Sequence, residues 1–227
     1  MAYKPVKHTD RDKAWNRKNT FDRPYKVESR PKGKSYLIVC EGANTEAEYF
    51  RCIPAPNASV IIEGGHGSKT SLVMKALELR KREEYVGREV WCVYDMDYKG
   101  DQVGQKQDFN ESIELARRKK MNVAYSNDAF ELWFVLHYQP VEQAFLRFDY
   151  YRILNGLWEI DDYEEEGKRR QFCKEIYDRL SNDPCSSLAL AIERARGLLE
   201  AFRARPFADQ NPCTTVFQLI EALQEED

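Results

Sequence analysis

Four short apolar runs, each followed by a segment with helical spacing, constrain the fold of this chain more than any other feature. The runs are too short for buried helices and are rich in residues that favour strands. They cover residues 35–40, 60–62, 90–94 and 123–126. Strands that alternate with helices indicate a mainly parallel sheet covered by its crossover helices. We therefore expect an α/β fold with a mainly parallel four-stranded sheet flanked by helices.

The pattern changes after Asn127, where strand-like runs give way to helical spacing. Thr45 and Glu48 are spaced as a capping box, which predicts a helix start at Thr45 in the strand-rich part. Further helices are expected near residues 130–138, 142–157, 167–181, 186–204 and 214–225. The chain is thus divided into a basic N-terminal arm (1–34), an α/β core (35–138) and a C-terminal helical extension packed on that core (139–227).

The N-terminal arm differs in charge from the rest of the chain. Residues 1–34 hold 11 Lys or Arg and 4 Asp or Glu, whereas the whole chain has a net charge of −3. Tyr3, Trp15, Phe21 and Tyr25 are interleaved with these cations. Cations that contact phosphates and aromatics that stack on bases are typical of nucleic-acid binding. A solvated tail without a ligand is the alternative.

Compartment and membrane association follow from what the sequence lacks. No apolar run approaches the ~20 residues that cross a bilayer, so we expect no membrane span. The basic N-terminus has no apolar segment behind it, which argues against a secretion signal. The six cysteines form no CxxC pair, so reduced structural thiols in the cytoplasm are expected, and no zinc site. A homo-oligomer is compatible with all of this.

Acidic residues follow two of the predicted strands at the point where each strand ends. Glu41 follows the first strand, and Asp95 and Asp97 follow the third. The carboxyl ends of parallel strands meet at one edge of the sheet, and Glu46 lies in the first turn of the next helix, close enough to join them. Clustered carboxylates repel one another unless a cation neutralises them. A divalent ion such as Mg²⁺ or Mn²⁺ held by Glu41, Glu46, Asp95 and Asp97 is therefore expected.

Simpler explanations exist for each acid taken alone. Glu46 is favourable at a helix N-terminus because of the helix dipole, and Asp95 and Asp97 could simply begin a loop. A cation site requires that the four side chains converge. An arginine that neutralised them would argue against it.

The segment "SNDAFELWFVLHY" (126–138) predicts an amphipathic core helix that carries two further polar candidates. Glu131 could approach the end of the fourth strand and serve as a further metal ligand or as a catalytic base that acts from behind the ligands. His137 could orient a phosphate or a water molecule. Burial in the core is the alternative for both residues. The loop "GGHGSKT" (64–70) lacks the spacing of a Walker motif and predicts a strand-to-helix turn.

Several motifs in one order resemble a known protein family. A strand that ends in Glu-Gly and a later strand that ends in Asp-x-Asp resemble the TOPRIM fold of primases, topoisomerases and OLD-type nucleases. More specifically, "YLIVCEGANTEAEYF", "VYDMD", "AYSNDAFELWFVLHY" and "NPCTTVFQLIEAL" resemble the RloB-like family. The resemblance covers about residues 35–223. It departs at Asn127–Asp128, where relatives often have Asn-Pro.

The resemblance implies a TOPRIM-like fold and a metal-dependent nuclease that acts on DNA or RNA, including transfer RNA, in anti-phage defence beside an ATPase partner. Glu41 would then be a metal ligand or general base, Asp95 and Asp97 would be metal ligands, and Glu46 would suit a second cation. Two alternatives remain open. One is a non-catalytic module that binds metal or a partner, and the other is nucleotidyl transfer, which the lack of a template-binding segment disfavours.

Overall fold

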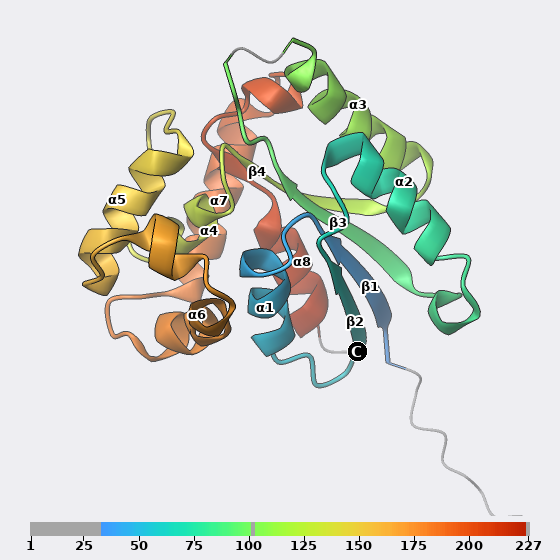
Figure 1. The fold of residues 1–227 in the computed structure, drawn as a ribbon, viewed down its shortest axis with the longest axis horizontal. Coiled ribbons are helices and arrows are strands. Elements are labelled where there is room, and N and C mark those ends of the chain that lie inside the picture. The colour runs from blue at the N-terminus through green and yellow to red at the C-terminus, as the bar shows by residue number, and fades with distance from the viewer. Residues whose placement is uncertain (1–32, 101–102, 226–227) are drawn as a thin grey trace, which may run out of the picture. The chain divides into compact units, whose positions relative to one another are not determined.

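The computed structural model describes residues 33–100 and 103–225 (Figure 1). The predicted N-terminal arm lies outside these residues except for its last two positions. Among the described residues, no helix is long and apolar enough to cross a membrane.

The sheet contains the four predicted strands, all parallel, and one short strand that the sequence did not reveal. The strands are β1 (Ser35–Cys40), β2 (Ser59–Gly64), β3 (Glu89–Asp95), β4 (Asn122–Asn127) and β5 (Cys213–Thr214), in the spatial order β2-β1-β3-β4-β5. Strand β5 is antiparallel to β4 and pairs Thr214 with Ser126. The α/β fold is therefore confirmed, whereas the strand count of four is wrong because residues 213–214 leave the helical pattern and join the edge of the sheet.

Eight α-helices and several shorter turns are found in the described residues. The α-helices are α1 (Thr45–Cys52), α2 (Lys69–Leu79), α3 (Gln105–Arg118), α4 (Glu131–Leu136), α5 (Arg147–Trp158), α6 (Arg170–Asn182), α7 (Leu188–Phe202) and α8 (Val216–Gln224). Helix α1 begins at Thr45 as predicted, but the expected capping box does not form. Glu48 instead pairs with Arg51 and Arg170, which satisfies its buried carboxylate.

Side-chain alternation along the strands divides the core between the two faces of the sheet. Leu37 and Val39 of β1 face helices α2 and α3, while Ile38 and Cys40 face the opposite side. That second side is covered by helices that include α1, α4 and α8 (Figure 1). Both faces are covered, so the inner positions of the central strands β1 and β3 are apolar on both faces, as in other parallel sheets.

The C-terminal residues contribute to the sheet as well as to the helical layer. The hydroxyl of Thr215 accepts a hydrogen bond from the backbone N–H of Tyr125 at 2.9 Å, and the backbone N–H of Thr215 donates to the carbonyl of Tyr125 at 2.8 Å. These bonds satisfy backbone groups at the β4 edge that β5 is too short to reach. Thus the predicted core and the predicted extension share one sheet.

Candidate functional site

A cavity of about 260 Å³ lies where β1 and β3 end. The loop after β1 and the start of α1 form one wall, and the end of β3 forms another. Four carboxylates predicted from the sequence line this cavity: Glu41, Glu46, Asp95 and Asp97. We call them the acidic cluster. Parallel strands place their ends at one edge, which explains why residues so far apart in sequence meet there.

The backbone of the β1–α1 turn positions the first two acids. Glu41 continues the sheet by donating its backbone N–H to the carbonyl of Val93 at 2.9 Å. Its Oε2 lies 3.4 Å from the backbone N of Asp95, which links the two strand ends. A Cβ on Gly42 would lie 2.0 Å from Oε2 of Glu46, so only glycine leaves room for that carboxylate.

Asp95 is a buried member of the acidic cluster, and one of its two carboxylate oxygens lacks a hydrogen-bond partner among the described residues. Its Oδ2 accepts a hydrogen bond from the backbone N–H of Phe130 at 2.9 Å. Its Oδ1 is buried and has no partner among the described residues. Burial raises the pKa of Asp95 well above its ordinary value, and the nearby Glu46, Glu131 and Glu41 raise it further. A buried carboxylate oxygen without a donor is costly unless a proton or a cation satisfies it.

The two glutamates are perturbed in the same direction. Burial raises the pKa of Glu41 to about 7, while the positive charge of Lys69 opposes the rise. Burial likewise raises the pKa of Glu46, which the positive charge of Lys168 opposes. Raised carboxyl pKa values mean that the negative charge here exceeds what the surrounding groups stabilise.

Asp97 differs from the other three acids because basic side chains already neutralise it. It adopts a positive φ of 47°, and its Oδ1 lies 2.6 Å from Nη2 of Arg147. Lys99 Nζ lies 3.4 Å from its Oδ2. A neutralising arginine argues against a cation site, and Arg147 is such an arginine for Asp97.

Arg147 is held in place by the loop after β4. The carboxylate of Asp128 accepts hydrogen bonds from the backbone N–H groups of Tyr98, at 2.6 Å, and Arg147, at 3.2 Å. Asp128 therefore ties the loop after β3 to the start of α5. The sequence did not predict either role: Asp128 stands out only because it replaces the proline that relatives often have, and Arg147 lies in a segment that shows helical spacing alone.

Glu131 does not line the cavity but lies behind it. This side chain is 1% exposed, forms an ion pair with Lys168 and accepts a hydrogen bond from the hydroxyl of Tyr163 at 3.2 Å. Lys168 does line the cavity. Glu131 thus holds the ammonium group of Lys168 beside the acidic cluster.

His137 lies outside the acidic cavity. It lines a separate cavity with Tyr49, Tyr177 and Ser186, and its Nδ1 is 3.3 Å from the Ser186 hydroxyl. Burial, with a smaller contribution from the positive charge of Arg194, lowers the pKa of His137 to about 4. The imidazole is therefore neutral and buried, the alternative considered for it above.

Comparison with known proteins agrees with this arrangement of motifs. A family model described as "RloB-like protein" matches residues 36–223, which is most of the chain. The chain belongs to the RloB-like family. No curated protein and no solved structure matches it.

The donor chemistry of this RloB-like cavity suits a hard divalent cation, because carboxylate oxygens are the ligands that Mg²⁺ and Mn²⁺ prefer. The buried Oδ1 of Asp95, which has no hydrogen-bond partner among the described residues, is the oxygen best suited to bind such an ion. As the side chains lie, however, no group of three or more His, Cys, Asp or Glu residues in the described part of the chain is arranged to hold a metal. The ligand type and the burial of three carboxylates, those of Glu41, Glu46 and Asp95, therefore suit a divalent ion. Their side chains would have to rotate to enclose it.

Proposed function

We propose that this RloB-like protein is a divalent-metal-dependent hydrolase that cleaves phosphodiester bonds of DNA or RNA. One observation carries the proposal. Four carboxylates from two segments of the chain line one cavity at the strand ends, and a buried oxygen of Asp95 has no partner among the described residues. A cluster of this kind lowers the stability of the fold, because burial and mutual repulsion both disfavour the charged carboxylates. A functional role is therefore a better explanation for it than a structural one.

Glu41, Glu46 and Asp95 are the residues that would hold Mg²⁺ or Mn²⁺. The bound ion would supply a nucleophilic water at neutral pH and stabilise charge on the leaving oxygen. A Glu41 carboxylate that binds the ion cannot also accept a proton, so Glu41 would be either a ligand or, with its metal-free pKa of about 7, the general base. Arg147 and Lys168 line the same cavity and are suited to bind the phosphodiester backbone.

Family membership supports the biological part of the proposal. The RloB-like resemblance associates such chains with anti-phage defence and with an ATPase partner. We include both in the proposal: the partner ATPase controls cleavage, and the substrate is DNA or RNA, with transfer RNA among the candidates. Incubation of the protein with DNA and RNA pools in Mn²⁺, with and without the ATPase, identifies the substrate.

Two variants test the hydrolase directly. Glu41→Gln and Asp95→Asn are expected to abolish cleavage while the protein stays folded, since each removes a charge from the cluster. Glu114→Gln is the matched control, because Glu114 is an exposed acid on α3 outside the cavity. Full activity in both site variants would disprove the proposal.

A non-catalytic module is the second candidate, favoured by the ion pair between Asp97 and Arg147. In that case the cluster binds a structural cation or the basic groups of a partner. Mg²⁺ or Mn²⁺ would then raise the melting temperature, while neither the protein alone nor its complex with the ATPase would cleave any nucleic acid.

A further inference from the structure

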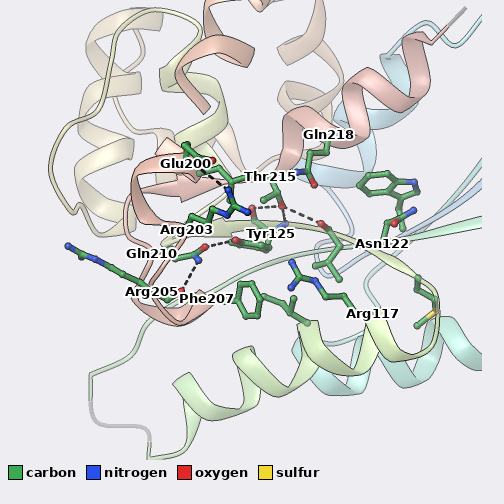
Figure 2. Close-up of a pocket in the computed structure, with 15 residues that line it drawn as sticks. Arg117, Asn122, Tyr125, Glu200, Arg203, Arg205, Phe207, Gln210, Thr215 and Gln218 are labelled. Carbon is green, nitrogen blue, oxygen red and sulfur yellow. Dashed lines mark hydrogen bonds and ion pairs between the residues drawn. The ribbon is translucent and has the colours of Figure 1, made fainter. Parts of the chain in front are cut away.

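A cavity of about 480 Å³, larger than the acidic cavity, lies along the outer edge of β4 (Figure 2). Residues 122, 123 and 125 of β4, the end of α3 and the segment after α7 form its walls. None of the acidic cluster lines it. Its volume falls in the range of about 300–1,000 Å³ typical of small-molecule sites. We call it the β4-edge cavity.

The β4-edge cavity carries positive charge on a chain whose net charge is −3. Three arginines line it, Arg117, Arg203 and Arg205, against a single acid, Glu200. In Figure 2, Arg117 and Arg203 approach Tyr125 from opposite walls, whereas Arg205 extends away from the centre. Two guanidinium groups that face one space are suited to bind one anion between them.

Strong ion pairs do not neutralise the two inward-facing arginines, Arg117 and Arg203. Arg117 forms no ion pair with any described residue and lies over the ring of Phe207 at 4.6 Å from its centroid. Arg203 lies 3.5 Å from Glu200, and both side chains are more than two-thirds exposed. An exposed pair of this kind contributes little, so an incoming anion can replace the glutamate.

Hydrogen bonds between buried side chains form the floor of the cavity. The hydroxyl of Tyr125 donates to Oε1 of Gln210 at 2.5 Å, and Nε2 of Gln210 donates to the carbonyl of Arg205 at 2.9 Å. Both side chains are buried. These groups shape the cavity and leave the arginines and the exposed amide of Gln218 to contact a ligand.

We propose that the β4-edge cavity binds a nucleoside phosphate. Arg117 and Arg203 contact the phosphate, the apolar walls that include Trp91, Leu199 and Phe207 contact the nucleoside, and Gln218 hydrogen-bonds to it. Inorganic phosphate alone would leave most of the 480 Å³ unfilled. The nucleoside phosphate has two sources, a free nucleotide or the phosphorylated end of a strand. This inference does not rest on the proposed hydrolase, since the two cavities share no residue.

Isothermal titration of the full-length protein tests the inference. The probes are the four nucleoside 5′-monophosphates, a 5′-phosphorylated trinucleotide, adenosine and inorganic phosphate, each without divalent metal. We expect at least one phosphorylated nucleoside or the trinucleotide to bind about tenfold or more tightly than adenosine or inorganic phosphate. Binding of the trinucleotide without the mononucleotides would identify the strand end as the source.

Matched variants locate the bound probe. Arg117→Gln and Arg203→Gln are each expected to weaken binding about tenfold or more, since each removes one charged donor. Arg118→Gln is the control, because Arg118 is the exposed neighbour on α3 that does not line the cavity. Glu41→Gln should leave this binding unchanged. The inference fails if no phosphorylated probe binds, if inorganic phosphate binds as tightly, or if Arg117→Gln and Arg118→Gln behave alike.

Discussion

The guanidinium of Arg147 lies 2.6 Å from a carboxylate oxygen of Asp97, so a residue of α5 neutralises one of the four clustered acids. Arg147 and a divalent cation would therefore compete for the same negative charge. Arg147→Gln is expected to tighten Mn²⁺ binding by about tenfold, because a positive charge within a few ångströms opposes a cation even when partly screened. Titration calorimetry with Mn²⁺ measures the change.

Arg152→Gln is the control for this variant. Arg152 is on the same helix but pairs with Asp149, and neither residue lines the acidic cavity. Mn²⁺ affinity should therefore stay at the wild-type value. Equal affinities in the wild type and Arg147→Gln would contradict a competition between Arg147 and the cation.

Local pattern was enough to locate the acids, since Glu41 and Asp95 end apolar strands and parallel topology brings strand ends together. It could not locate the basic residues around them. Arg147 and Lys168 come from a region whose sequence shows only helical spacing, and their approach depends on long-range packing of α5 and the turn before α6. Strand β5 was missed for a similar reason, because two residues carry no detectable period.

Glu41→Gln is expected to stabilise the metal-free protein at pH 8. Burial raises the pKa of Glu41 from an ordinary value of 4.5 to about 7. The folded state therefore retains a proton that the unfolded state releases between these values, and stability falls as pH rises through this window. The glutamine should add about 1–3 kcal/mol to the free energy of unfolding at pH 8 and little at pH 4. Urea denaturation in EDTA at both pH values measures this, and equal gains at both would contradict it.

Gly42→Ala is expected to weaken Mn²⁺ binding. The added Cβ would lie 2.0 Å from Oε2 of Glu46, so the carboxylate must leave its position in the cavity. Gly156→Ala is the control, because a Cβ there meets nothing within 4 Å and the residue lies inside α5. That control should gain about 0.5–1 kcal/mol of stability from its better helix propensity, with unchanged Mn²⁺ affinity. Unchanged Mn²⁺ affinity in Gly42→Ala would show that metal binding does not depend on the present position of the Glu46 carboxylate.

Lys168→Met is expected to destabilise the protein by about 3 kcal/mol, since it leaves the buried carboxylate of Glu131 without its cation. The hydroxyl of Tyr163 would remain as a hydrogen-bond donor to Glu131 but cannot neutralise it. Lys174→Met, at an exposed position of α6, serves as the control and should change stability by less than about 0.5 kcal/mol. Chemical denaturation at pH 7 compares them, and a similar effect in both would show that the Lys168–Glu131 pair is not a stabilising contact.

His137 and Glu41 are expected to change the stability of the fold with pH in opposite directions. Burial lowers the pKa of His137 from 6.5 to about 4. Between pH 6.5 and pH 4 the imidazole is therefore protonated in the unfolded state and neutral in the folded state. Stability is then lost as pH falls from 6.5 toward 4, by about 3 kcal/mol from this residue alone.

The variant His137→Gln tests this effect, because a glutamine side chain does not titrate. The variant also loses the edge-on contact with Trp133, whose ring centroid lies 5.1 Å from that of His137. The difference in unfolding free energy between wild type and variant isolates the histidine from other titrating groups. We expect the wild type to lose its advantage over His137→Gln between pH 7 and pH 4.5 in urea denaturation. A constant difference across this range would mean that His137 is protonated equally in the folded and unfolded states.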